Sequence, residues 1–202
     1  EGPVFGEFLQ KVDWEDSSHN RVLEETRAVR VYATPDSFRS MQFTVQLRAT
    51  EGEVRLGDTK EGGLCSVRVA TVMDGDKGGR IENSLGGIGE SECWGKPAHW
   101  CDYSGTVEGK QVGVAIFDHP MNLRHPTCWH VRDYGLMTAN PFGYSHYQSS
   151  LLRDGTYTIA AGSSLTFRYR IYVHEHDARR AGIRSRYHDY VHPPVVEIDE
   201  KI

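Results

Sequence analysis

The sequence predicts a mainly all-β fold, an antiparallel β-sandwich with one C-terminal helix. Residues Met41–Arg48 alternate apolar and polar side chains without a fault, and Leu165–His174 does the same. Strict alternation is the pattern of a strand that buries one face. Glycine-containing turns separate most of the apolar runs, and only one stretch has the spacing of a helix. The chain shows no internal repeat and no linker, so residues 1–202 are expected to form a single β-sandwich domain.

The first part of the chain is expected to supply neighbouring strands. Val4–Asp16 is a strand-like run of mixed character, and the polar cluster Asp16–Asn20 marks a turn. Val22–Thr34 predicts a second strand, and Pro35–Ser37 a second turn that leads to Met41–Arg48. Because so short a turn joins them, these last two strands are expected to pair with each other.

Strands and glycine-rich loops alternate through the middle of the chain. Leu64–Thr71 predicts a strand, and loops are expected at Asp74–Arg80 and Ser84–Glu92. The first loop lacks the GK[ST] ending of a phosphate-binding loop. Gln111–Phe117 returns from a hairpin-like turn and is apolar on both faces, so it is expected to lie at the centre of a sheet.

One helix is expected near the C-terminal end. Ile183, Tyr187, Tyr190 and Val191 fall on a single stripe at helical spacing. Asp177 is the expected N-cap of this helix. A His-Pro-Pro sequence follows the stripe and ends the helix, because proline cannot continue it.

The composition bounds the classes of partner. The net charge is −5, which argues against a nucleic-acid partner, since binding to phosphates needs a basic face. No apolar run approaches the roughly 20 residues that cross a bilayer, so we expect a soluble protein without a membrane partner. The compartment is not readable, and periplasmic, secreted and cytoplasmic locations all stay open, as does a homo-oligomer.

Four cysteines are present: Cys65, Cys93, Cys101 and Cys128. None belongs to a CxxC pair, so a structural zinc ribbon is not expected. Each has apolar or aromatic neighbours, which favours buried free thiols. A Cys93–Cys101 disulfide is the alternative that spacing alone leaves open.

The stretch richest in chemistry is Trp94–Gly143, and its densest part is Phe117–Gly135. We expect this part to be a turn-rich loop after the central strand, crowded with imidazole, guanidinium and carboxylate groups. Burying a polar group without a partner costs roughly 2–7 kcal/mol, so such groups must satisfy one another or a ligand. The loop is therefore the predicted site.

Acid–base chemistry is the first use considered for this loop. A carboxylate paired with a histidine across a cleft suits proton transfer at a sugar carbon. The candidate catalytic residues are His119, His125, His130, Glu61 and Asp102. The alternative is structural, since a carboxylate such as Asp118 or Asp133 also caps turns. The histidines are irregularly spaced and form no HExxH motif, so no metal site and no cofactor are expected, although a metal ion stays an open alternative.

Carbohydrate binding is the second use. Aromatic faces stack on the CH groups of a pyranose, while planar side chains hold its hydroxyls. The candidate substrate-binding residues are Asn122, Arg124, Trp129, Arg132, Tyr134 and Asn140. The alternative is that part of these aromatic residues belongs to the core, as in any β-sandwich.

Four motifs carry a resemblance to a known family: Lys60–Cys65, Asn83–Lys96, Trp100–Gly105 and Phe117–Gly143. Together they resemble the DUF6807 family, whose members are often labelled PmoA family or methane oxygenase PmoA. The resemblance covers nearly the whole chain and implies a galactose-mutarotase-like supersandwich and a place in carbohydrate metabolism. Family members usually carry an upstream His-rich segment of the HPHH type, which this chain lacks, so the chain is expected to hold part of the family's site.

The leading hypothesis is a protein that acts on a sugar or keto-glycoside by His and carboxylate acid–base chemistry, as a lyase, hydrolase or epimerase. Its expected partner is a small-molecule carbohydrate. A non-catalytic sugar-binding or assembly module is the second hypothesis. A metal-dependent oxygenase, as the family label suggests, is the third.

Overall fold

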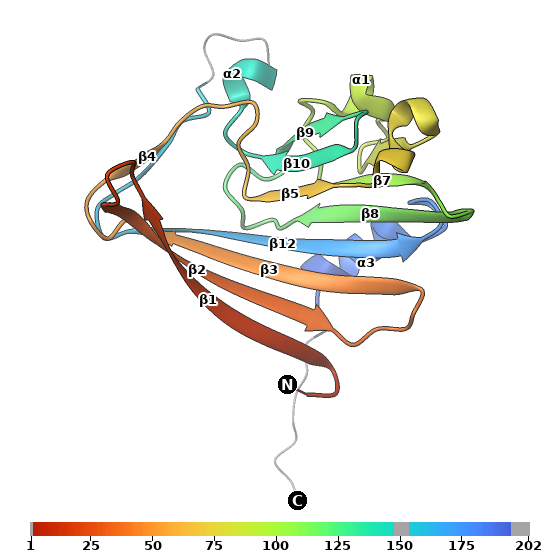
Figure 1. The fold of residues 1–202 in the computed structure, drawn as a ribbon, viewed down its shortest axis with the longest axis horizontal. Coiled ribbons are helices and arrows are strands. Elements are labelled where there is room, and N and C mark those ends of the chain that lie inside the picture. Colours follow the sequence, from red (N-terminus) through yellow and green to blue (C-terminus); the bar gives the residue numbers. More distant parts are fainter. Residues whose placement is uncertain (1, 148–153, 195–202) are drawn as a thin grey trace, which may run out of the picture.

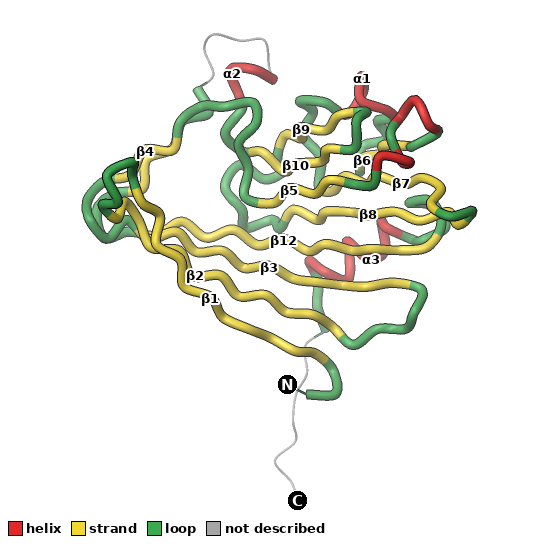
Figure 2. Tube along the Cα trace, in the orientation of Figure 1, coloured by secondary structure: helices red, strands yellow, loops and turns green. Residues whose placement is uncertain are grey.

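The computed structural model describes residues 2–147 and 154–194, and within them the fold is mostly β (Figures 1 and 2). A seven-stranded antiparallel sheet has the order β1-β2-β3-β12-β8-β7-β6. Its strands are β1 (Phe5–Glu15), β2 (Arg21–Tyr32), β3 (Phe38–Arg48), β6 (Arg80–Asn83), β7 (Trp100–Val107), β8 (Lys110–Asp118) and β12 (Ser164–Glu175). The expected mainly β fold is confirmed.

A smaller sheet covers one face of the large one. It has the order β5-β10-β9, with β5 (Cys65–Arg68), β9 (Cys128–Arg132) and β10 (Leu136–Asn140). The main core lies between the two sheets, where Ile116 and Phe167 from the large sheet are buried with Trp129 and Met137 from the small one. Two short strands, β4 (Val54–Leu56) and β11 (Tyr157–Ile159), pair beside this core.

The opposite face of the large sheet carries a second core beneath helix α3 (Ile183–Val191). Phe117 and Tyr172 from the sheet pack there with Ile183 and Tyr190 from the helix. Figure 1 shows α3 behind β12 and β3, on the side away from the small sheet. Neighbouring residues of one strand, such as Ile116 and Phe117, therefore face different cores.

The strands with strict alternation behave as expected. β3 pairs with β2 and with β12, and Leu165, Phe167 and Tyr169 of β12 are buried in the main core. β8 lies between β12 and β7, which confirms the central place expected from its apolar pattern. Alternation predicted β3 and β12 because their side chains in the main core recur at every second position, as Val45 and Leu47 do in β3.

The last part of the expected loop Phe117–Gly135 instead forms β9 and the turn of the β9–β10 hairpin. The prediction was wrong because polar side chains stand between Trp129, Val131, Met137 and Ala139 in the sequence and mask their alternation. All four of these side chains are fully buried. The turn passes through Gly135, whose φ of 91° is a conformation that glycine adopts without strain.

Three helical details also differ from the expectations. A short helix, α1 (Gly89–Cys93), lies where a loop was expected, and a second short helix is α2 (Tyr144–Tyr147). Two 3₁₀ turns lie at Thr71–Met73 and Gly75–Lys77. Asp177 does not cap α3: its Oδ1 accepts from the backbone N of Arg180 in a preceding turn. The N-cap of α3 is Gly182, at a φ of 68°.

All four cysteines are free and buried, so the expected buried thiols are confirmed and the Cys93–Cys101 disulfide is not formed. Burial raises the pKa of both Cys65 and Cys93 to about 12, which leaves these thiols protonated and unreactive. Among the helices of the described residues, none is long and apolar enough to cross a bilayer.

Candidate functional site

Asp118, the last residue of β8, is the buried end of a hydrogen-bonded array. Its Oδ2 accepts from Nδ1 of His125 at 2.7 Å and from the backbone N of Thr127 at 3.1 Å. Its Oδ1 accepts from Nδ2 of Asn122 at 2.7 Å. N–H groups of Asn122 and Thr127 therefore donate to both oxygens of this fully buried carboxyl group.

A second histidine continues the array towards the surface. Nε2 of His125 lies 3.0 Å from Nδ1 of His99, and the two ring centroids are 5.1 Å apart. We call these three residues the Asp118–His125–His99 array. Within the part of the chain that the structure describes, no group hydrogen-bonds Nε2 of His99, which is half-buried.

With the carboxylate of Asp118 as the acceptor, the contacts of the array assign one tautomer to each ring. Because Asp118 accepts from Nδ1 of His125, the neutral His125 ring carries its proton there and its Nε2 is an acceptor. Nδ1 of His99 must then be the donor in the contact between the rings. Nε2 of His99 is left with a lone pair, which is the arrangement of a general base.

Strand pairing places His99 next to Asp118. β7 and β8 pair with Trp100 opposite Phe117, and the backbone N of Asp118 donates to the backbone O of His99 at 3.0 Å. The backbone N of His99 donates to Oγ of Ser84 at 2.8 Å. The backbone of His99 is therefore held at the end of the large sheet by one bond from the β8 backbone and one to the side chain of Ser84.

Burial lowers the pKa of His99, and the neighbouring His125 lowers it further, while the charge of Asp118 opposes both effects. His99 is therefore neutral at neutral pH and able to accept a proton. The ring of Tyr187 on α3 lies 5.7 Å from the His99 ring. Burial, aided by Asp118, raises the pKa of Tyr187 to about 12, so its hydroxyl stays a proton donor.

His119 lies beside the array, against the same helix. Its Nδ1 accepts from the backbone N of Met121 at 3.1 Å, so a neutral ring carries its proton on Nε2. The ring contacts Tyr190 edge to face at 5.4 Å. Burial lowers the pKa of His119, and the charge of Arg168 lowers it further, which keeps the ring a neutral donor.

The structure brings together His119 and His125 but not the other three candidate catalytic residues. His130 lies on β9, where its Nδ1 accepts from Nε1 of Trp94 at 3.2 Å, and burial lowers its pKa. Glu61 is exposed, with Nζ of Lys60 3.7 Å from its carboxylate.

Asp102 lies under the α3 side of the large sheet, 2.7 Å from Nε2 of His174.

Four of the candidate substrate-binding residues make their polar contacts within the fold. Asn122 binds Asp118 and both backbone groups of Arg168. Trp129 is fully buried and donates to the backbone O of Ala98 at 2.9 Å.

The other two hold backbone segments together. Arg124 donates to the backbone oxygens of Pro141, Gly155 and Thr156. Asn140 donates to the backbone O of Thr59 and accepts from the backbone N of Phe142.

Arg132 and Tyr134 reach the surface instead. Arg132 forms a 3.0 Å ion pair with Glu90, and its guanidinium lies 5.5 Å from the Tyr134 ring. Their binding role stays a prediction.

His99 was not among the candidate residues. It stands immediately before the strand that pairs with the end of β8, and this register is what sets it beside Asp118. The hairpin-like turn expected before Gln111–Phe117 could have indicated this neighbour, because it implies a strand that pairs with Gln111–Phe117. Among the residues that the structure describes, no three or more His, Cys, Asp and Glu side chains are grouped to hold a metal ion.

Comparison with known families gives one match. Residues 1–188 match the model described as "Family of unknown function (DUF6807)". No curated protein and no solved structure matches the chain.

Proposed function

The chain belongs to the DUF6807 family, and we propose that it acts on a carbohydrate, a sugar or a keto-glycoside, by proton transfer at the Asp118–His125–His99 array. The observation that carries the proposal is the pair of hydrogen bonds, 2.7 and 3.0 Å long, that joins a buried carboxylate to a ring with a free nitrogen. A galactose-mutarotase-like supersandwich is part of the same proposal, and the large sheet covered by a small one is compatible with it.

The array supports removal of a proton from a weakly acidic group. Nε2 of His99 would take the proton from a C–H bond beside a carbonyl or from a sugar hydroxyl. The positive charge that forms on His99 is stabilised through His125 by the carboxylate of Asp118, which is shielded from water. A general base in such a position contributes about 10²–10⁴-fold to a rate.

Two neutral donors near the array suit the charge that develops on the substrate. Burial raises the pKa of Tyr187, so its hydroxyl stays protonated at neutral pH. Burial lowers the pKa of His119, so its ring is neutral and keeps the single proton on Nε2. Either group can donate to an oxygen that becomes negative when the neighbouring C–H loses its proton. His125 acts through His99 and is a positioning residue in this scheme. Catalytic roles for His130, Glu61 and Asp102 remain separate predictions.

The test follows proton transfer without requiring a known product. A panel of monosaccharides and keto-glycosides is incubated with the protein in D₂O, and exchange of carbon-bound hydrogen is followed by NMR. We expect exchange with at least one member of the panel and a loss of about 10²-fold or more in His99→Gln. The matched control is His19→Gln, because His19 lies exposed in the β1–β2 turn.

Two results would contradict the proposal: no exchange with any member of the panel, or exchange in His99→Gln at the wild-type rate. Saturable binding of a sugar without exchange would support instead the alternative of a non-catalytic sugar-binding module.

A further inference from the structure

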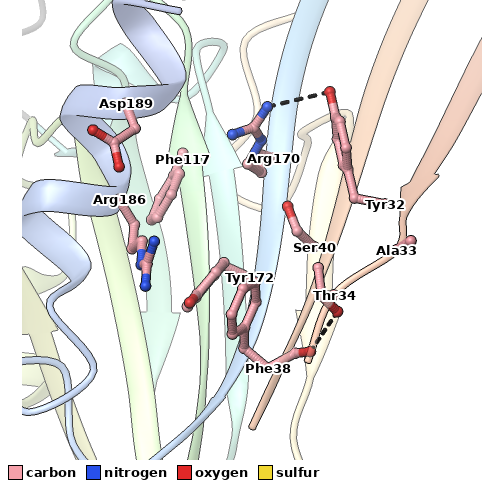
Figure 3. A pocket seen from close by; sticks show the side chains of 10 residues that line it. All are labelled: Tyr32, Ala33, Thr34, Phe38, Ser40, Phe117, Arg170, Tyr172, Arg186 and Asp189. Atoms are coloured by element: carbon pink, nitrogen blue, oxygen red, sulfur yellow. Dashed lines mark hydrogen bonds between the residues drawn. The ribbon is translucent and has the colours of Figure 1, made fainter. Parts of the chain in front are cut away.

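A pocket opens between α3 and the β2–β3 side of the large sheet, away from the small sheet (Figure 3). Its volume of about 240 Å³ lies below the roughly 300–1,000 Å³ of sites for drug-sized ligands, so it suits a single ring. The residues used below are Phe38 and Ser40 from β3, Arg170 and Tyr172 from β12, and Arg186 and Asp189 from α3.

Two arginines present positive charge to this pocket. The guanidinium of Arg186 lies 5.3 Å from the ring centre of Phe38 and 6.0 Å from that of Tyr172. Arg170 donates to Tyr32 and Gln42, and its buried Nε has no hydrogen-bond partner. Within the described residues, no carboxylate lies within 4.0 Å of either guanidinium.

Three stacked aromatic rings line the same pocket. Phe38 and Tyr172 are stacked with their centroids 5.1 Å apart and an interplanar angle of 27°. Phe117 continues the stack, 6.2 Å from Tyr172 at 15°. In Figure 3 the guanidinium of Arg186 extends past Phe117 towards Tyr172, so charge and ring surface face the same space.

We propose that this pocket binds a single sugar ring that carries a carboxylate, such as a uronic acid. The two arginines outnumber the one carboxylate in the lining, Asp189, which favours an anion. A guanidinium binds a carboxylate through two parallel hydrogen bonds. The aromatic rings offer contacts to the CH groups of a sugar ring, and the Ser40 hydroxyl together with the Tyr172 phenol suits its hydroxyl groups.

This site is separate from the Asp118–His125–His99 array and does not depend on it. The Phe117 ring lines the pocket and packs edge to face on Tyr187, 5.8 Å away. Tyr187 in turn covers His99. Two aromatic rings therefore stand between the pocket and the base, and each site can be tested without the other.

The test measures binding of D-glucuronate, D-glucose and benzoate by NMR titration of the full chain. We expect saturable binding of glucuronate with shifts at Phe38 and Tyr172, and weaker binding of both glucose and benzoate. Arg186→Gln is expected to weaken glucuronate binding about tenfold or more, because it removes a charged hydrogen bond. Arg184→Gln is the matched control, since it makes the same charge change two residues away and outside this pocket.

Arg186→Lys separates charge from shape: it should recover only part of the affinity, because an ammonium cannot bind a carboxylate with a planar fork. Glucose binding as tight as glucuronate would overturn the anionic character of the ligand. Benzoate binding as tight as glucuronate would overturn the sugar. An equal loss in Arg184→Gln and Arg186→Gln, or no saturation with glucuronate, would overturn the site itself.

Discussion

Nε2 of His174 lies 2.7 Å from Oδ2 of Asp102, with both side chains buried on the α3 side of the large sheet. The other ring nitrogen of His174 lies 3.1 Å from the backbone O of Glu175. Burial alone would lower the pKa of His174, but the hydrogen bond and charge of Asp102 outweigh it, so this pKa is raised. The folded protein therefore holds a proton on this pair more tightly than the unfolded chain does.

This raised pKa predicts a pH-dependent contribution to stability. The contribution is complete below the pKa of an unfolded histidine and is lost as the pH rises through the higher folded pKa. Urea unfolding of the wild type and His174→Asn between about pH 5 and 8 should show a stability difference that shrinks with rising pH. The exposed neighbour variant His176→Asn should show no such trend, and a constant difference for His174→Asn would refute the assignment.

Gly113 makes room for the His174 ring, and Gly113→Ala is predicted to displace it. A Cβ at this position would clash with Cε1 of His174 and lie 3.0 Å from Cβ of Ser104. Overpacking of this kind costs about 1–3 kcal/mol of the free energy of unfolding, measured in urea. Gly6→Ala is the control, because a Cβ there meets nothing within 4 Å and should leave the stability within about 0.5 kcal/mol of the wild type.

Asn122 is predicted to stabilise the loop that holds His125. Its side chain satisfies Asp118 and both backbone groups of Arg168, all in a buried setting. Asn122→Ala leaves these groups without partners and should lower the free energy of unfolding by about 1–3 kcal/mol. The exposed Asn20→Ala should change it by about 0.5 kcal/mol at most, and equal effects of the two substitutions would remove Asn122 from this role.

The sequence predicts the long strands of this fold well and the small sheet poorly. β3 and β12 alternate without a fault, and the side chains buried in the main core recur at every second position, as Leu165, Phe167 and Tyr169 do in β12. β9 places His130 directly opposite Thr138 of β10, and both side chains are buried. Histidine and arginine on so short a strand hide its apolar half, and only the pairing with β10 shows that the segment is a strand.

The sequence predicted which types of residue form the candidate site but not which particular residues belong to it. The position of His125 in the His-rich segment was enough to predict it as a site residue. His99 is identified only by the strand register that sets Trp100 opposite Phe117. Trp129 and Asn140 carry the chemistry of a sugar site, yet both side chains are buried and donate to backbone oxygens. A sequence shows which groups are available, while burial and register decide which of them face a ligand.

The acid–base character of His99 can be tested by its own titration. Its pKa is lowered by burial and by His125 and supported by the charge of Asp118. Asp118→Asn removes that support, so the NMR titration of His99 should move to a lower pH. Any hydrogen exchange catalysed by His99 requires the neutral ring, so its rate should rise with pH through the same titration and then level off.

In Asp118→Asn the inflection of the rate should move with the ring titration, while the plateau falls because the imidazolium formed on His99 loses its buried counter-charge. The exposed Asp36→Asn removes the same charge far from the array and should leave both curves in place. A His99 titration that stays unchanged in Asp118→Asn would show that the carboxylate does not act through His125. The two hydrogen bonds would then be structural only.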